Sequence, residues 1–431
     1  MNITMPAQQK TKSFFYALCA LVCLAYAGMK ITFYDAFKQI EPLLFVVVIY
    51  FFIFAKEERK SLPTLMLFVA AAYSGISWYI GHLTYPELFY KRPEIHQLTR
   101  FFIFLVIAFF LNGNSKRVFI MLTVASISLL LTPWVLGGGT TELKLGLQGH
   151  RIDFNIQNAQ HTAMLFGSVL IGSLVFIKRA FKNKSHVPLV FLIVLILASS
   201  AAVYMTQTRA ITLALAIALL SYIILSMKGS TAKSKLSVIM IGLVLIIALA
   251  SIGQKSIVKI TSEESRISSL WNGDIKSIGN TSVGARANSW VAGWQWIKKS
   301  PLIGWGSRGG EVVAENTEWL KGTYSSSFGH MHSSYVEMLV RYGGLGFLIF
   351  TTLAIWIALN LWKAYKNDVV PKDIFFFLAL FFVYWSVINL FESYFFYWTG
   401  SYLISIVTAI AVSYIWKYQH TIKRESIRHE S

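Results

Sequence analysis

The chain carries little charge for its length. Of its 431 residues only 14% are charged, whereas 55% are hydrophobic. A soluble chain of this length would divide into about two or three domains with polar surfaces, which this composition does not provide. Apolar runs of about 20 residues recur instead, and this is the length that crosses a bilayer as a helix. The sequence therefore predicts an all-α polytopic membrane protein.

Cysteines and acidic residues are scarce as well. Cys19 and Cys23 are the only cysteines, and no histidine or acidic residue stands beside them, which favours packing over a disulfide or a metal site. The 20 acidic residues are outnumbered by 39 basic ones. Because much of this basic excess lies in short loops between apolar runs, we interpret it as an orientation signal and expect no nucleic-acid partner. The apolar stretch after Lys12 lacks a small-residue cleavage site, so we expect it to stay as the first span.

Hydropathy predicts about 12 transmembrane spans. They are residues 13–33, 41–55, 62–83, 96–111, 117–136, 161–178, 187–205, 210–227, 235–252, 338–362, 373–394 and 397–416. The loops after even-numbered spans are basic, as in "KEERK" and "KAYKNDVVPK", which places both termini in the cytoplasm. The expected division is nine spans in 1–252, one large periplasmic loop with short helices in 253–337, three spans in 338–416 and a basic cytoplasmic tail in 417–431.

An arginine stands at the start of the eighth span. Residues 206–209 read "TQTR", a very short polar connection that the span count places on the outer face. A snorkelling side chain is the simplest explanation for Arg209 at such a position. The short outer loops carry few cations, however, so Arg209 is not needed for orientation. We interpret it as a ligand for the head group of a lipid-linked anion.

Residues 253–332 form the one extended hydrophilic segment. At about 80 residues it is too long for a simple connection, which indicates a function. Within it, "ARANSWVAGWQWIKKS" predicts a helix that places Trp290, Trp294 and Ile297 on one face. A tryptophan-rich amphipathic helix is typical of the membrane interface. Arg286 stands at the start of this helix. Its spacing fits either a solvated side chain or a residue of a functional site.

Two histidines precede the tenth span. His330 and His332 alternate as metal ligands can, but no third ligand lies at a convincing spacing, so no metal is expected. Neutral histidine accepts a proton near physiological pH, which makes His332 a candidate general base, with local hydrogen bonding as the alternative. Glu337 either orients His332 or pairs with Arg341.

Four motifs, taken in order, resemble the O-antigen ligase and O-antigen polymerase superfamily of bacterial envelope enzymes. They are "TQTRA", "TSVGARANSW", "GWGS" and "HMHSSYVEMLVRYGGLG", and the resemblance covers most of the chain from about residue 150. "SGISWYIG", "RIDF" and "TQTRA" are more similar to the ligase than to the polymerase branch. Ser333 departs from the pattern, because the family often has asparagine after the histidine.

The resemblance implies a glycosyltransferase of the bacterial inner membrane that needs neither metal nor cofactor. It would move O-antigen from undecaprenyl diphosphate to a sugar hydroxyl of lipid A–core on the periplasmic side, surrounded by membrane lipids and with inversion at the anomeric carbon. Arg209 and Arg286 would stabilise the diphosphate, since guanidinium groups suit phosphate oxygens. His332 would be the base, and Tyr335 and Glu337 are candidate substrate-binding residues.

The acceptor carries phosphates of its own. Lys91, Arg92 and Arg100 in the second outer loop, with Lys144 and Arg151 in the third, are candidates to hold them, and interfacial anchoring is the alternative. Three other functions stay open. An O-antigen polymerase would use the same residues, a secondary transporter would show paired repeats, of which none is apparent, and a scaffold would need no site.

Overall fold

The computed structural model describes residues 7–227, 282–321 and 329–430, and every element in these ranges is helical. The α-helices are α1 (Ala7–Met29), α2 (Tyr34–Ile40), α3 (Leu43–Phe54), α4 (Leu62–Thr84), α5 (His96–Thr99), α6 (Phe104–Leu111), α7 (Ser115–Val135), α8 (Gly139–Leu147), α9 (Ala159–Lys182), α10 (His186–Thr206), α11 (Arg209–Met227), α13 (Ser282–Lys299), α14 (Gly309–Asn316), α15 (Ser334–Lys366), α16 (Lys372–Ile388) and α17 (Trp398–Glu430). The 3-10 helices are η1 (Glu58–Lys60), η2 (Pro86–Leu88), η3 (Arg100–Ile103), η5 (Glu318–Leu320) and η7 (Tyr394–Phe396).

Six helices of the described residues are long and apolar enough to cross a membrane, namely α4, α7, α9, α10, α15 and α17. The pair α2 and α3, bent by 51°, makes a seventh if it is one span. The polytopic all-α class is confirmed, but the expected count of about 12 spans is not supported. Three expected spans are shorter apolar helices, Phe14–Met29, His96–Leu111 and Arg209–Leu225. The ninth, 235–252, and the first part of the large loop, 253–281, lie outside the described residues.

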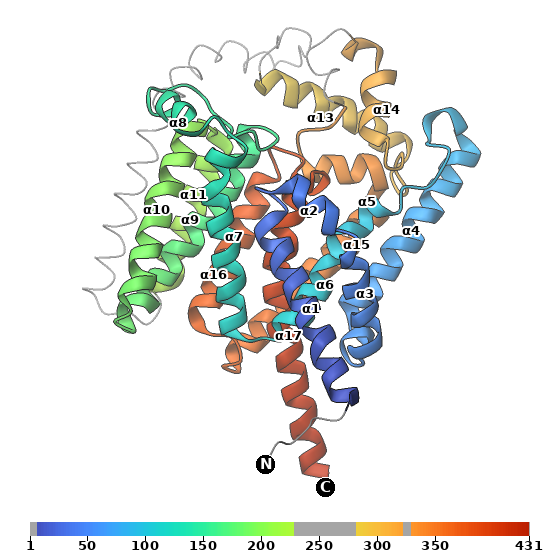
Figure 1. The fold of residues 1–431 in the computed structure, drawn as a ribbon. Helices are drawn as coiled ribbons and strands as arrows, with labels where there is room; N and C mark the ends of the chain where they lie inside the picture. Colours follow the sequence, from blue (N-terminus) through green and yellow to red (C-terminus); the bar gives the residue numbers. More distant parts are fainter. Residues whose placement is uncertain (1–6, 228–281, 322–328, 431) are drawn as a thin grey trace, which may run out of the picture.

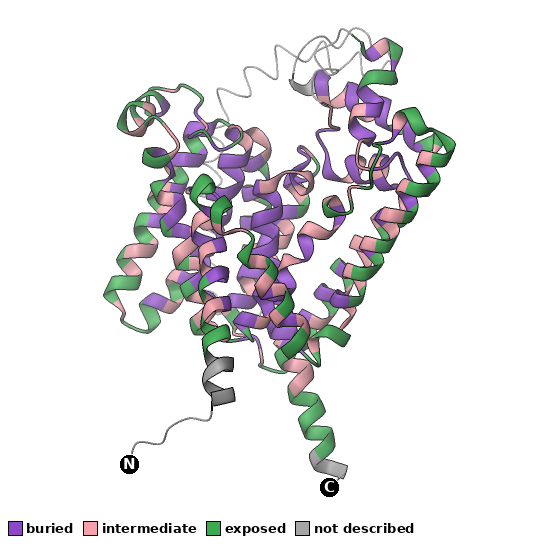
Figure 2. Ribbon diagram, turned by 45° about the vertical axis from the view of Figure 1, so that its right-hand side comes forward, coloured by how far each residue is buried: buried purple, intermediate pink, exposed green. Residues whose placement is uncertain are grey.

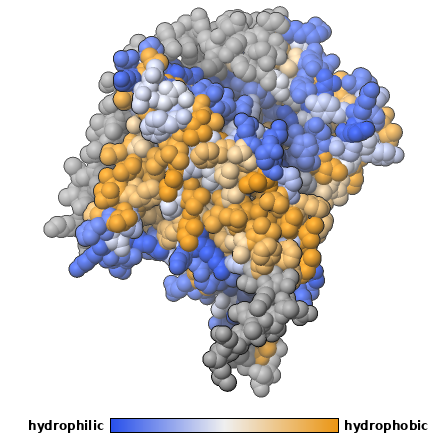
Figure 3. All heavy atoms as spheres, viewed as in Figure 1, coloured by the Kyte–Doolittle hydropathy of each residue, from blue (hydrophilic) through white to orange (hydrophobic). Residues whose placement is uncertain are grey.

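The helices form a bundle with two distinct ends. α1, α7, α9 to α11, α16 and α17 run roughly upright, with α13, α14 and α8 at one end and the C-terminal end of α17 at the other (Figure 1). On the face shown in Figure 3, an apolar band covers the middle, with hydrophilic residues above and below. This is the surface expected of a bilayer-spanning protein.

Burial differs strongly among the helices. Buried residues gather in the centre of the bundle, whereas outward faces are exposed (Figure 2). The apolar window of α17 is 94% buried, against 22% for α10, so α17 is the central helix and α10 a peripheral one. The expected tail 417–431 is largely the exposed continuation of α17, which ends at Glu430. Cys19 and Cys23 are buried in the core without a disulfide, as their packing interpretation requires.

The eleventh expected span, 373–394, is shorter in the structure. α16 ends at Ile388 because Asn389 makes bonds outside the helix. Its carbonyl accepts the Ser334 N–H at 2.9 Å and its side-chain oxygen accepts the Ser334 hydroxyl at 2.5 Å. The chain then forms a turn, residues 389–397, that contains η7. Hydropathy misses this break because aromatic residues keep the local average high.

α13 forms where the sequence predicted a helix, but a different face is buried. Trp290, Trp294 and Ile297 were expected on one side, whereas the Trp294 side chain is 58% exposed and Ile297 is buried. Trp296 is the buried tryptophan, and its indole N–H donates to the Thr317 hydroxyl at 2.9 Å. A buried indole needs such a partner, and that partner lies outside the helix, beyond the reach of a periodicity argument.

α15 is bent at Gly343, whose backbone angles are φ 59° and ψ −168°. Residues 301–303, which directly precede "GWGS", pack into this bend, where the Gly344 N–H donates to the Pro301 carbonyl at 2.8 Å. A Cβ atom at Gly343 would lie 2.3 Å from the Leu302 carbonyl carbon, so no other residue fits. The tenth expected span, 338–362, lies within α15, and its first residues precede the bend.

Candidate functional site

A short segment before α15 carries both histidines in a constrained backbone. His332 has φ +48°, a left-handed conformation that costs a non-glycine residue about 1–3 kcal/mol. Its neighbours hold it there. The Met331 N–H donates to Glu337 Oε2 at 2.5 Å, and the Ser334 N–H donates to the Asn389 carbonyl at 2.9 Å. Such strain is stored at positions that the surrounding structure over-determines, which are often functional.

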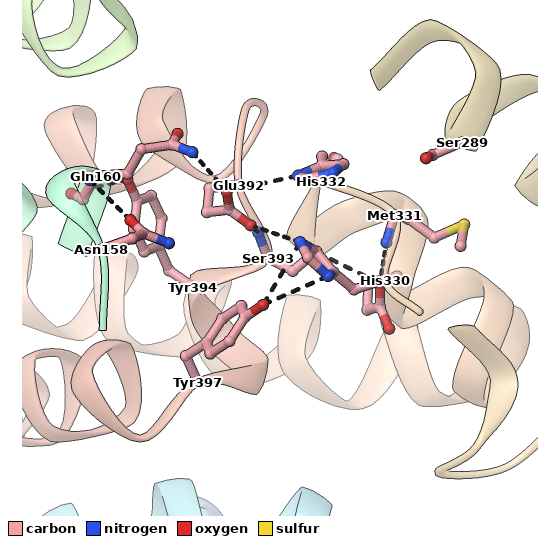
Figure 4. A network of polar contacts seen from close by, with 12 residues as sticks. Asn158, Gln160, Ser289, His330, Met331, His332, Glu392, Ser393, Tyr394 and Tyr397 are labelled. Atoms are coloured by element: carbon pink, nitrogen blue, oxygen red, sulfur yellow. Dashed lines mark hydrogen bonds and ion pairs between the residues drawn. The ribbon is translucent and has the colours of Figure 1, made fainter. Parts of the chain in front are cut away.

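Glu392, in the 389–397 turn, lies beside both histidines, whose rings contact each other (Figure 4). Its carboxylate is 3.3 Å from His330 Nε2 and 3.6 Å from His332 Nδ1, and it also accepts the Ser393 N–H at 2.9 Å. Burial raises the pKa of Glu392, but its side-chain interactions with His330 and His332 outweigh burial and hold that pKa well below its usual range. Glu392 is therefore an ionised carboxylate with 2% exposure.

The electrostatics of His332 suit a proton acceptor. Burial lowers the pKa of His332, and the nearby charges of His330 and Arg286 lower it further, while Glu392 opposes the shift. The net direction is downward from an ordinary value of about 6.5. The imidazole is thus neutral at neutral pH, which is the form that can take a proton.

Gln160 connects this carboxylate to an arginine. From the first turn of α9, its Nε2 donates to Glu392 Oε2 at 2.9 Å (Figure 4). The Arg286 Nη2 donates to Gln160 Oε1 at 3.2 Å, and its Nε donates to the Phe391 carbonyl at 2.9 Å. Asn158 caps α9 and fixes Gln160, whose N–H it accepts at 2.8 Å. A continuous polar path therefore runs from Arg286 to both histidines.

Three arginines interact electrostatically at this site. Burial lowers the pKa of Arg286, Glu392 raises it, and the charges of Arg151 and Arg209 lower it again. Arg209 is the first residue of α11, where the helix N-terminus adds positive potential. Arg151 is tethered next to it, since its Nε donates to the Thr206 carbonyl at 3.2 Å. The arrangement concentrates positive charge beside the Glu392 carboxylate, which is the environment an anion of high charge requires.

Aromatic side chains surround the network. The Tyr394 hydroxyl donates to the Gln160 carbonyl at 3.2 Å, and the Tyr397 hydroxyl lies 3.4 Å from His330 Nδ1. The buried ring of His161 is 4.7 Å from that of Tyr397. These rings limit water around the polar groups, and charge interactions are stronger in such a low-dielectric setting.

A single segment of the chain carries Arg209, Arg286 and His332. Residues 193–351 match the O-antigen ligase family model. The match confirms the resemblance to the O-antigen ligase and polymerase superfamily, and it does not separate these two activities. The matched segment covers less than half of the chain, so Gln160 and Glu392 lie outside it. No curated protein matches the chain at a significant level.

Two further residues of the O-antigen ligase segment support the histidines rather than face them. Glu337 pairs with Arg341, one of the two alternatives for this residue, and accepts the Met331 N–H. The Tyr335 hydroxyl donates to the Ser386 carbonyl of α16 at 3.0 Å. Both side chains thereby fix α15, and neither reaches the Glu392 carboxylate that lies beside the histidines.

The basic residues proposed for the acceptor are scattered. Lys91, Arg92 and Lys144 are exposed on the surface. Arg151 lies with Arg209 and Arg286, as described above. Arg100 lines a separate cleft and donates from Nη2 to the Phe395 carbonyl at 3.2 Å. The structure thus places these candidates in three different environments.

Sequence reasoning missed Glu392 and Gln160. Glu392 fell inside the eleventh expected span, in the aromatic run "FESYFFYW", and was counted as part of a hydrophobic segment. One signal was available, because an acidic residue within an apparent span is itself an indication of function. Gln160 offered no such signal, since a glutamine near a helix start is common.

The residues around Glu392 include a possible donor set for a metal ion. The ligand atoms of His330, His332 and Glu392 lie within 4.8 Å of one another. Two imidazole nitrogens and a carboxylate are a combination that zinc accepts. Glu392 is thus the third ligand that spacing along the chain did not reveal. The two histidines already contact Glu392 directly, so the arrangement also fits a carboxylate that orients two imidazoles.

Proposed function

We propose that the protein is an O-antigen ligase of the bacterial inner membrane. It transfers a polysaccharide from undecaprenyl diphosphate to lipid A–core on the periplasmic side, without a metal and with inversion at the anomeric carbon. The observation that supports this most is the polar path from Arg286 through Gln160 and Glu392 to His332, because it links a phosphate-binding group to a base.

The arginines act on the leaving group. As the glycosidic bond breaks, its electron pair goes to the lipid diphosphate, which gains negative charge. Arg286 and Arg209 present forked donors to the phosphate oxygens, and Arg151 adds a third charge. Arg286 is held in place by Phe391 and Gln160, so little reorganisation is needed when the charge develops. Fixed cations of this kind do the work that a divalent ion does in many transferases.

His332 acts on the acceptor. It takes the proton of the acceptor hydroxyl as that oxygen forms a bond to the anomeric carbon, on the face opposite the departing diphosphate. His332 Nδ1 lies 3.6 Å from the Glu392 carboxylate, so the tautomer with its proton on Nδ1 directs that N–H toward Glu392 and leaves Nε2 to accept the proton. The imidazolium that forms is stabilised by the ionised carboxylate of Glu392. Attack from the opposite face accounts for inversion.

An O-antigen polymerase is the second candidate, because the matched family includes it. The same residues would then pass the glycan to another lipid-linked repeat unit. The similarity of "SGISWYIG" and "RIDF" to the ligase branch favours the ligase. A transporter is less favoured, because the polar path links an arginine, a carboxylate and a histidine as an acid–base site does, and does not resemble a route for conduction.

A deletion strain separates these candidates. Loss of capped lipopolysaccharide with accumulation of long lipid-linked chains supports the ligase, whereas accumulation of single lipid-linked repeats identifies a polymerase. Unchanged lipopolysaccharide and lipid-linked pools would reject both. Plasmids encoding the wild-type protein and the Arg286→Ala variant, at matched membrane levels, control for indirect effects of the deletion.

A further inference from the structure

A cleft of about 420 Å³ opens beside the 389–397 turn. Aliphatic and aromatic side chains of α1, α3, α4 and α6 form most of its wall, together with the first residues of α17. Its charged and titratable members are Tyr26, Lys30, Glu41, His96 and Arg100. Lys30 and Glu41 pair with each other at 2.5 Å. The cleft therefore keeps the positive charge of Arg100 within a largely apolar wall.

Arg100 has no counter-ion in the part of the chain that the structure describes. No carboxylate there lies within 4.0 Å of its guanidinium, and its buried Nε has no hydrogen-bond partner. Its only hydrogen bond to the protein there is the one from Nη2 to the Phe395 carbonyl, and its charge lies 5.5 Å from the Phe101 ring centroid. A partly buried guanidinium that lacks a carboxylate leaves donors available for an anion, and phosphate is the anion that its fork suits best.

The cleft and the base are connected through the 389–397 turn and the start of α17. The Phe395 N–H donates to the Ser334 hydroxyl at 3.1 Å, and Ser334 follows His332 by two positions. Tyr397 contacts His330, and the next residue, Trp398, lines the cleft. Residues 395–398 thus contact both Arg100 and the segment that carries the histidines.

Two arginines hold the same turn at different points. Arg286 donates to the Phe391 carbonyl and Arg100 to the Phe395 carbonyl, with Glu392 in the chain between them. The arginine cluster at the first point suits the diphosphate of the donor. Arg100, a second cation beside the apolar wall of the cleft, suits a second amphipathic substrate. This matches the need of a transferase for two lipid substrates on either side of one base.

We propose that this cleft binds the acceptor, a phosphorylated glycolipid, with Arg100 on a sugar phosphate and the acyl chains along the apolar wall. The assignment rests on the proposed function for the identity of the acceptor. It commits to a glycolipid phosphate rather than to a bulk phospholipid, because only a glycolipid brings the reacting sugar hydroxyl to His332. Of the five basic residues singled out in the sequence for this task, the cleft selects Arg100.

Steady-state transfer by the purified protein tests the assignment. Arg100→Ala should raise the KM for the acceptor roughly 10- to 100-fold, the usual effect of losing a charge-assisted hydrogen bond, with the KM for the donor unchanged. Lys38→Ala is the matched control, since Lys38 is an exposed cation of α2 outside the cleft. An equal rise in both KM values would overturn the proposal.

A dephosphorylated acceptor gives a sharper result. With this acceptor, the KM of the wild-type protein should rise about as much as the KM of Arg100→Ala rises with the native acceptor. The two increases in KM should not add when the variant is given the dephosphorylated acceptor. Additive losses would show that Arg100 and the phosphate act independently, which contradicts the assignment.

Binding to the His332→Ala variant separates this proposal from the proposed function. Phosphorylated glycolipid should bind this variant, and the further change Arg100→Ala should weaken binding. That result supports the cleft even if transfer to lipid A–core is never observed. Equal competition by an anionic phospholipid without sugar would overturn the cleft assignment and leave the transfer reaction untouched.

Discussion

An arginine contacts the 389–397 turn on each of two sides, and the two arginines differ in how many of their hydrogen-bond donors have partners. On the first side, Arg286 donates hydrogen bonds to the Phe391 carbonyl and to Gln160. The negative charge of Glu392 stabilises its positive charge, and two further arginines act on it electrostatically. At Phe395, Arg100 has a single backbone bond and an apolar cleft. The first side is assembled before any substrate arrives, whereas the second has donors left over. Under the proposed function, this difference means that the Arg286 side stabilises charge that develops during the reaction, whereas the Arg100 side only holds a charge that is already present.

Removing the base between the two sides should have the largest effect. His332→Ala is expected to lower kcat roughly 10²- to 10⁴-fold, the range of general-base catalysis, with both KM values little changed. Transfer by purified protein, at equal amounts of folded protein, measures this. Near-normal transfer would remove His332 from the mechanism.

Breaking the Arg286 side comes next. Arg286→Ala and Arg209→Ala should each cost roughly 10²- to 10³-fold in kcat, as the loss of a charge-stabilising donor does elsewhere. Arg286→Lys should also be impaired, because an ammonium cannot reach both the Phe391 carbonyl and Gln160 as the guanidinium does. A fully active lysine variant would argue that only the charge matters.

Uncoupling the two sides should have a moderate effect. Glu392→Gln keeps the shape of the side chain but removes the charge that faces the imidazolium, and a loss of about 10- to 100-fold in kcat is expected. Gln160→Leu, which breaks the link between Arg286 and Glu392, should cost less than Glu392→Gln. If Gln160→Leu were the more harmful, the link rather than the carboxylate would be the important element.

The pH dependence of transfer tests the interaction between Glu392 and His332. The pKa of His332 is lowered by burial, so its basic form is present above that pKa and is lost as the pH falls through it. A plot of kcat/KM against pH should therefore fall on the acid side, below about pH 6.5. Glu392 raises the pKa of His332, so Glu392→Gln should move this limb to lower pH. A limb that stays in place would show that another group titrates.

Removing metal should have the smallest effect. If the arginines supply the positive charge, a chelator leaves transfer by the purified protein unchanged. Loss of activity that zinc restores would instead assign His330, His332 and Glu392 to a metal ion. Arg286→Ala protein assayed with added divalent cation is the control, because rescue there would show that the charge lost with the guanidinium, and not a missing metal ion, limits transfer.

Parts of the fold and site were accessible to sequence reasoning because they depend on local pattern. Apolar length predicted α4, α7, α9 and α10 close to their observed bounds. Local chemistry singled out Arg209, Arg286 and His332, each of which stands at the start of an element or just before one. The position of α13 followed from its spacing and from Pro301, although its buried face did not.

Other parts were inaccessible because they depend on partners distant in the chain. α16 ends at Ile388 because Asn389 bonds to Ser334, and no window over the aromatic run contains that information. The bend at Gly343 exists because the segment after Pro301 packs against it.

The sequence alone determined that this chain folds into apolar helices of membrane-spanning length, and it singled out two arginines and a histidine as candidate site residues. Hydrophobic length and side-chain chemistry are local properties, and they suffice for those conclusions. Only the tertiary structure decided that Gln160 and Glu392 join Arg286 to His332, and that Arg100 faces a cleft of its own. The reason is physical, because a hydrogen bond depends on the distance between two atoms, and packing alone brings residues 160, 286 and 392 within that distance.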